Sequence, residues 1–162
     1  MNILTPLVFN GGVYTSSYGG RSHFYAIKRE SKSWKSEEQW ENKAQAYMCS
    51  PVLFEGHAYL HLRNQRFACY DLSKGTEAWV SDKRFGKYMS LVRQGDKILA
   101  LDQNGMLYLI QANPEKLTIV DSKKISKQQT WAHLAVSGEQ LSIRELNAIS
   151  VYDWRTTDAI LP

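Results

Sequence analysis

The chain has 162 residues, of which 43% are hydrophobic and 22% charged, and its net charge is +4. This length and composition are typical of one globular domain and exclude a disordered chain. The 20 Lys and Arg residues are spread along the sequence without forming a basic stripe, so no nucleic-acid partner is indicated. No apolar run reaches the roughly 18 residues of a membrane span. We see no signal peptide either, which leaves the compartment open; it would be periplasmic or secreted if the chain is a fragment of an exported parent.

Four similar units follow one another along the chain. Each begins with a short apolar strand that ends at a glycine, and these glycines are 45, 39 and 43 residues apart: Gly11, Gly56, Gly95 and Gly138. A period of about 40–45 residues is typical of the four-stranded blade of a β-propeller. The spacing therefore predicts that each unit is one blade.

The segments after each glycine repeat as well. The expected second strands are residues 13–18, 58–63, 97–102 and 140–145, and the third strands are residues 23–28, 66–71, 106–111 and 148–153. Asn or Gly separates the second strand from the third, as two-residue hairpin turns require. A more polar outer strand follows in three units, at residues 38–43, 77–82 and 117–122, and the fourth unit lacks it.

These elements predict an all-β fold of propeller-type blades with four antiparallel strands each. We expect about four blades, the last one incomplete, in a single segment over residues 1–162. We favour part of a larger propeller, and a tight four-bladed ring is the alternative. The blade boundaries fall near 1–46, 47–86, 87–129 and 130–157. The missing last strand leaves an open sheet edge, and such an edge invites another chain. We therefore expect a protein partner, or self-association, to complete the propeller.

The second unit has the clearest turn between its third and outer strands. Asp71 ends the third strand, and its carboxylate is placed to accept hydrogen bonds from turn amides. Gly75 supplies a left-handed turn position. Trp79 is expected to reach the neighbouring blade as an apolar anchor, with an indole N–H that needs an acceptor. These three residues are structural by this interpretation.

Residues 32–43 form a second aromatic and charged stretch. We interpret it as a long loop followed by an edge strand, and a short amphipathic helix is the alternative. Rim loops of this kind often carry binding residues. The aromatic residues near it are our candidate partner surface: Tyr14, Tyr18, Trp34 and Trp40.

The stretch "YDLSKGTEAW" resembles the blade signature of the pyrroloquinoline-quinone-like (PQQ-like) β-propeller repeat family. Cys69 stands at its small position and Lys74 at its Thr, while Asp71, Gly75 and Trp79 match. Residues 130–154 are similar to the C-terminal part of bacterial quinone-propeller-like proteins. The other units depart from the signature, because Trp34 and Trp40 are both out of register and the third unit has no Trp.

The resemblance implies two functions. One is a non-catalytic binding or scaffold module that presents rim loops to a protein or saccharide partner, and we favour it. The other is a segment of a quinoprotein dehydrogenase, whose relatives bind the quinone with calcium and often stack it against a vicinal disulfide. Cys49 and Cys69 are not adjacent, and no acidic residues converge on the first strands. We therefore expect no cofactor and no catalytic residue in this chain.

Two further groups contain residue types that occur in metal or catalytic sites. His57 and His61 share one face of a strand but lie about 13 Å apart along it, which is too far for one metal ion. Asp102 ends the second strand of its unit, whereas Asp153 ends the third strand of its own. The two carboxylates need not face each other, so we expect them to cap turns and not to act as a catalytic pair. No metal site is predicted.

Overall fold

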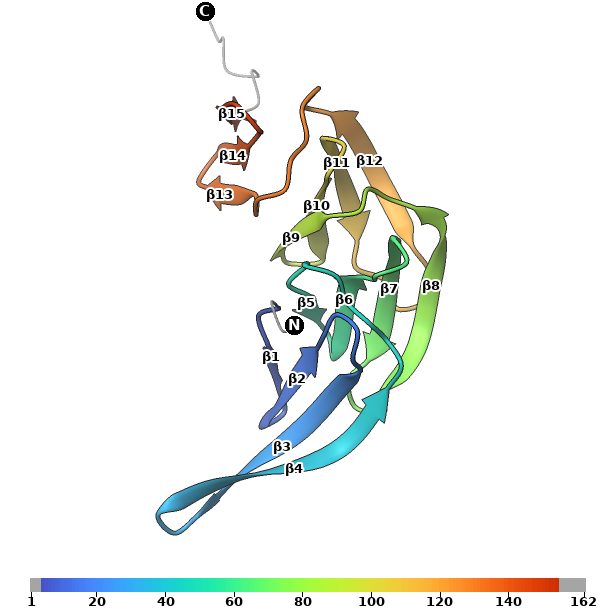
Figure 1. Ribbon diagram of the computed structural model, residues 1–162, viewed down its shortest axis with the longest axis vertical. Coiled ribbons are helices and arrows are strands. Elements are labelled where there is room, and N and C mark those ends of the chain that lie inside the picture. Colours follow the sequence, from blue (N-terminus) through green and yellow to red (C-terminus); the bar gives the residue numbers. More distant parts are fainter. Residues whose placement is uncertain (1–3, 155–162) are drawn as a thin grey trace, which may run out of the picture.

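The computed structural model describes residues 4–154, and within that range the chain forms fifteen strands and no helix. Figure 1 shows the strands as successive antiparallel sheets, which we call blades 1 to 4. Blade 1 contains β1 (Leu7–Phe9), β2 (Gly12–Ser16), β3 (Ser22–Glu30) and β4 (Ser33–Asn42). Blade 2 contains β5 (Val52–Phe54), β6 (His57–His61), β7 (Arg66–Asp71) and β8 (Thr76–Arg84).

Blade 3 contains β9 (Met89–Gln94), β10 (Lys97–Asp102), β11 (Met106–Gln111) and β12 (Thr118–Lys124). Blade 4 contains β13 (Ala135–Ser137), β14 (Gln140–Arg144) and β15 (Ile149–Asp153). Within residues 4–154, no strand pairs with β15 on its outer side. The predicted all-β class, the four-stranded blades and the incomplete last blade are confirmed. The predicted boundary of the last unit, at 157, lies outside the described residues.

One backbone hydrogen bond recurs in every blade and explains why the units match. The donor is the N–H of a residue within the third strand in blade 1, and of the residue directly after the third strand in blades 2 to 4; the acceptor lies in the turn between the first and second strands. The bonds are Ile27 to Gly11, Leu72 to Gly56, Ala112 to Asp96 and Trp154 to Glu139, at 2.8–3.0 Å. The turn glycine at Gly11 has φ of 71°, a conformation that side chains disfavour. This closure fixes the register of the first three strands.

Three apolar cores lie between consecutive blades. Between blades 1 and 2, the buried side chains include Tyr14, Leu60 and Leu72, and between blades 2 and 3 they include Tyr59, Phe67 and Ile98. A smaller core joins blades 3 and 4, through Leu101, Leu134, Leu141 and Ile143. Within residues 4–154, blades 2 and 3 are thus packed on both faces, and blades 1 and 4 on one face each, as consecutive blades of a propeller are.

Each outer strand of blades 1 to 3 carries a β-bulge at the same place. The extra residue is Gln39, Ala78 and Val120 respectively. The residue after the bulge pairs with Phe24, Cys69 and Leu109, and it is Trp40, Trp79 and Asp121. A bulge re-aims the side chains that follow it. Trp40 is therefore in register with Trp79, and the sequence-based interpretation that placed it out of register is wrong.

The stretch at residues 32–43 is neither a long loop nor a helix. Strands β3 and β4 form one hairpin that extends beyond the rest of the sheet, at the lower left of Figure 1. Its tip is a tight turn at Ser31, with φ of 48°. Ion pairs Lys28–Glu37 and Glu30–Lys35 cross the extension. Paired charges across the strands favour a hairpin over a helix here.

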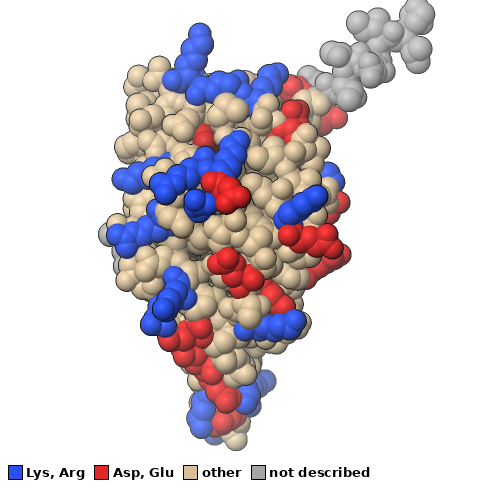
Figure 2. Space-filling model, turned by 90° about the vertical axis from the view of Figure 1, so that its right-hand side faces the viewer, with Lys and Arg blue, Asp and Glu red and all other residues tan. Residues whose placement is uncertain are grey.

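The side of the molecule on which β4, β8 and β12 lie carries mixed charge. Figure 2 shows Lys and Arg interspersed with Asp and Glu over this face. A mixed surface of this kind does not provide the continuous positive field that a nucleic-acid backbone requires. Within residues 4–154 there is also no helix long and apolar enough to cross a membrane.

Candidate functional site

The three motif residues of blade 2 lie at the joint with its neighbours. Asp71 Oδ1 accepts hydrogen bonds from the Ser73 amide (2.8 Å), the Ser73 hydroxyl (2.5 Å) and the Lys74 amide (3.3 Å). The Gly75 amide donates to the Asp71 carbonyl at 2.8 Å, and Gly75 has φ of 71°. Trp79 Nε1 donates to the Asn113 carbonyl of blade 3 at 2.8 Å. These residues therefore hold the turn and join it to the next blade.

Trp40 makes the same kind of joint between blades 1 and 2. Its Nε1 donates to the Leu72 carbonyl at 2.9 Å, and its ring stacks on Phe24 at a centroid distance of 5.8 Å. The ring lies directly on Gly75, where an added Cβ would come within 2.4 Å of Trp40 Cδ2. Gly75 is thus required both by its backbone conformation and by the neighbouring indole.

The four aromatic residues of the candidate partner surface do not form one surface. Tyr14 is fully buried and bonds to Ser22 at 3.1 Å, so its expected place on the surface is corrected. Trp40 is half-buried between blades. Trp34 is 69% exposed at the hairpin, and Tyr18 is 38% exposed in the β2–β3 turn. Only Trp34 and Tyr18 are placed to meet a partner.

Tyr18 instead begins a row of four rings that crosses all four blades, which we call the aromatic row. Its centroid lies 5.0 Å from Tyr47, which lies 5.4 Å from Tyr88, which lies 5.4 Å from Trp131. Tyr47, Tyr88 and Trp131 come from the segments that connect one blade to the next. The row therefore lies where the blade connections gather.

Two cations lie against the aromatic row. The guanidinium of Arg63 is 4.6 Å from the Tyr18 centroid, and Lys87 Nζ is 5.4 Å from the Tyr88 centroid and 5.8 Å from that of Tyr47. A hydrogen bond with Tyr88, together with burial, raises the pKa of Tyr47 above its usual range. At the surface the row thus combines positive charge with the exposed rings of Tyr18 and Trp131 and the partly exposed ring of Tyr88, while Tyr47 is 7% exposed and links them from within. A groove between blades 1 and 2, lined in part by Arg63, continues from it.

Three members of the aromatic row occupy similar positions in the sequence repeats, and this pattern was overlooked in the sequence analysis. Tyr47, Tyr88 and Trp131 each stand two or three residues before an aligned first strand that begins at Ser50, Ser90 or His133. An aromatic residue at a fixed place in three repeats is a pattern that indicates a shared structural position.

The histidines and cysteines named in the sequence analysis take structural positions. His57 Nδ1 lies 2.9 Å from the Glu55 carbonyl, whereas His61 is fully buried and burial lowers its pKa to about 4. Cys49 and Cys69 are both free and buried, and burial raises the pKa of each thiol to about 12. Thiols of such high pKa are poor nucleophiles and metal ligands at neutral pH.

Asp102 is a buried turn cap. Its Oδ1 accepts from the amides of Asn104 (2.9 Å) and Met106 (3.1 Å), and its Oδ2 accepts from the Gly86 amide (3.1 Å). This side chain joins the β10–β11 turn to the connection that leads into blade 3. It is 2% exposed and is occupied by backbone donors, which suits a structural role.

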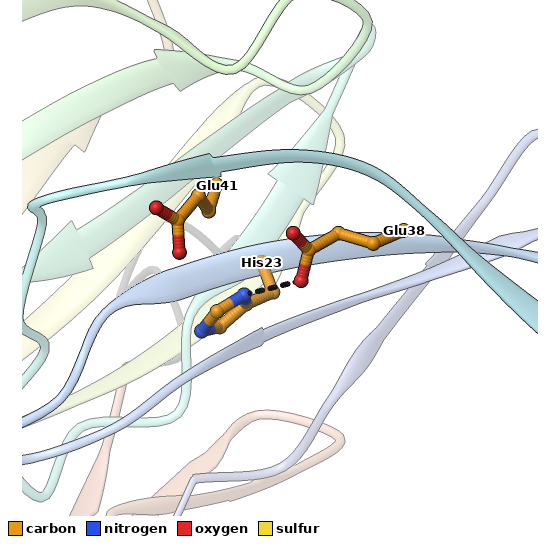
Figure 3. A group of neighbouring side chains, drawn as sticks. All are labelled: His23, Glu38 and Glu41. Atoms are coloured by element: carbon orange, nitrogen blue, oxygen red, sulfur yellow. Dashed lines mark hydrogen bonds and ion pairs between the residues drawn. The ribbon is translucent and has the colours of Figure 1, made fainter.

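A group of three titratable side chains lies on the outer face of blade 1. His23, Glu38 and Glu41 each offer one ligand atom, and these atoms lie within 4.8 Å of one another. Figure 3 shows the His23 ring, on β3, between the two carboxylates of β4, with a hydrogen bond of 2.9 Å from its Nδ1 position to Glu38 Oε2. The expectation of no metal site overlooked this group. Its residues lie on two strands, and they meet only because of the bulge at Gln39.

The comparisons with known proteins agree with this arrangement of blades and joints. The family described as outer membrane protein assembly factor BamB, of the PQQ-like repeats, matches residues 2–81. Residues 2–81 of the chain are thus similar to PQQ-like propeller repeats. The crystal structure of BamB from Moraxella catarrhalis superposes with a TM-score of 0.71 at 14% identity, covering 93% of this chain and 43% of that chain. No curated protein matches.

Two other solved structures share the arrangement of blades seen in this chain. The β-propeller domain of Cps50 (Swd1) from Myceliophteria thermophila has a TM-score of 0.63 at 10% identity, covering 88% of this chain and 52% of that one. The computationally designed Ika4 protein has a TM-score of 0.59 at 6% identity, covering 91% and 88%. The chain thus spans less than half the length of the BamB structure and about half that of Cps50. At such identities the likeness shows the fold alone.

Proposed function

We propose that this chain is a non-catalytic binding module of the PQQ-like propeller type, which presents the aromatic row to a protein partner. The proposal rests mainly on the continuous series of ring contacts from Tyr18 through Tyr47 and Tyr88 to Trp131. Tyr, Trp and Arg are the residues most enriched at the energetic centres of protein interfaces. The propeller supplies rigid sheets beneath the row, so little conformational entropy is lost on binding.

The surroundings of the rings favour a protein over a saccharide. Tyr47 and Tyr88 stack on each other with an interplanar angle of 23°, and Arg63 and Lys87 lie over ring faces. Sugar stacking would therefore have few free faces, mainly that of Trp131, which is 58% exposed. The two cations instead favour acidic side chains on the partner, which they would bind as ion pairs at the rim.

A photo-crosslinking residue at position 131 tests the proposal in the source cell. A discrete adduct with one protein is expected from position 131, and it should be lost when Lys87→Glu and Arg63→Glu are introduced together. The control is the same residue at position 120, because Val120 is 52% exposed on β12, away from the row. Identical adducts from both positions, or adducts that survive the charge reversal, would contradict the proposal.

The alternative, a segment of a quinoprotein dehydrogenase, is tested separately. We expect no change in the quinone absorbance when the protein is titrated with pyrroloquinoline quinone and Ca²⁺, and no reduction of an artificial acceptor with alcohol or sugar. Saturable quinone binding would favour the dehydrogenase. Whether the chain uses a cofactor stays a prediction until this titration is done.

The edge of blade 4 supports a second contact with protein. On β15, Ile149 is 73% exposed and Val151 is 56% exposed, and within residues 4–154 the strand pairs with β14 alone. Strand addition at this edge, by a partner or by a second copy, would complete the blade. Sedimentation over a range of concentrations tests self-association, and a monomer throughout would argue against pairing of copies. The description of the matching family names outer membrane assembly. This supports our proposal that, if the chain is a fragment of an exported parent, the parent is periplasmic or secreted.

A further inference from the structure

The outer face of blade 1 differs from the equivalent faces of blades 2 and 3. Counted from the bulge, the positions of His23, Glu38 and Glu41 correspond to Ala68, Glu77 and Val80 in blade 2, and to Tyr108, Ile119 and Ser122 in blade 3. Most of these equivalents are packed in the cores against the preceding blade: Ala68, Val80, Tyr108 and Ile119. The blade fold itself therefore does not require polar residues at these positions.

The bulge brings the two carboxylates to one face. In a regular strand Glu38 and Glu41 would point to opposite faces, because their separation of three residues is odd. The extra residue Gln39 restores a common face, while Trp40 turns to the other side and joins blade 2. His23 pairs directly with Glu41 across the strands, and Glu38 lies one row away, opposite Tyr25. The strand pairing and the bulge together therefore bring the three side chains close to one another on the same face.

The chemistry of the three ligand atoms indicates which metal ions the group would bind. An imidazole with two carboxylates suits Zn²⁺ and similar divalent transition metals, whereas Ca²⁺ and Mg²⁺ prefer oxygen ligands alone. Three protein ligands with an open fourth position are a common zinc arrangement. Zinc bonds of about 2.0–2.2 Å place the ligand atoms roughly 3–3.5 Å apart. The widest spacing here, up to 4.8 Å, would close by rotation of the Glu side chains, which are each 44% exposed.

Arg21 supports the group by binding one of its carboxylates. Its guanidinium donates a hydrogen bond to Glu41 Oε1 at 2.7 Å, which restrains that carboxylate and engages one of its two oxygens. Metal-binding carboxylates are commonly held by such hydrogen bonds. We propose that His23, Glu38 and Glu41 form a binding site for a divalent transition-metal ion on the outer face of blade 1. The site is independent of the aromatic row.

Isothermal titration of the metal-stripped full chain with ZnCl₂ tests the site. We expect one ion per chain with a micromolar or tighter dissociation constant. His23→Ala and Glu41→Gln should each weaken binding at least tenfold, while far-UV circular dichroism shows that both variants keep the sheet. Two controls should bind as the parent does: His57→Ala, which removes another accessible histidine, and Glu37→Gln, which removes a carboxylate of β4 that pairs with Lys28 instead.

Titration with Co²⁺ provides a second measurement. The parent should show a saturable visible absorption band at one equivalent, which zinc displaces and which His23→Ala lacks. The proposal is overturned if zinc binds with a dissociation constant above about 1 mM, or if His23→Ala binds as tightly as the parent. A stoichiometry that falls in His57→Ala would assign the binding to the wrong histidine and equally overturn it.

Discussion

Trp79→Ala is the sharpest test of the joints between blades. The indole packs at centroid distances of 5.9 Å from Phe67 and 6.2 Å from Tyr59, and it donates to the Asn113 carbonyl at 2.8 Å. Removing a buried Trp costs about 3–5 kcal/mol. Because Trp79 is only partly buried, we expect the lower end, about 3 kcal/mol, of which the hydrogen bond supplies about 1 kcal/mol.

Urea denaturation followed by far-UV circular dichroism measures this loss without depending on tryptophan fluorescence. Trp79→Phe keeps much of the ring packing and should cost about 1 kcal/mol, chiefly for the lost N–H. Trp34→Ala is the matched control, since Trp34 is 69% exposed, and it should change stability by less than about 0.5 kcal/mol. A loss below roughly 0.5 kcal/mol in Trp79→Ala, at unchanged urea dependence, would show that the indole does not join the blades.

Three more predictions concern single residues. Gly75→Ala should cost about 2 kcal/mol or more, measured by the same denaturation, because the new Cβ must displace Trp40 and the backbone has positive φ. Asp102→Ala should cost about 3 kcal/mol by thermal unfolding, since three backbone amides lose a charged acceptor. His61 predicts acid sensitivity: its folded pKa of about 4 lies below the unfolded value of about 6.5. The unfolded state therefore binds the proton first, so stability falls by up to about 3 kcal/mol as pH drops from 6.5 to 4, and His61→Leu should remove that slope.

Much of the fold could be predicted because its signals are local. Glycine ends each first strand and Asn or Gly marks each hairpin, and these residues act through their own backbone conformations. The register of Trp40 could not be read in this way. Phe24 and Trp40 are 16 residues apart, whereas the paired Cys69 and Trp79 are 10 apart, because the β3–β4 hairpin is longer. The number of residues along the chain therefore does not align Trp40 with Trp79, whereas their position relative to the bulge does.

The candidate sites depended on contacts between distant segments. Tyr14 and Tyr18 are four residues apart, yet one is buried and the other is exposed, because the strand ends between them at Ser16. His23 and Glu41 meet across two strands only in one register. The aromatic row joins segments from four blades, so only its repeated spacing was visible beforehand.

Asp121 gives the joint between blades 3 and 4 a different character from the other two. It occupies the position of Trp40 and Trp79, but its carboxylate is exposed and bonds to the amide of Ser122 at 2.7 Å. No indole at that position therefore packs against blade 4. The apolar core between blades 3 and 4 is also the smallest of the three. Amide protons of β13–β15 should exchange with solvent before those of blade 2, since the least-packed unit opens first. Within residues 4–154, the blade with the smallest core is thus also the one whose last strand, β15, pairs on one side only.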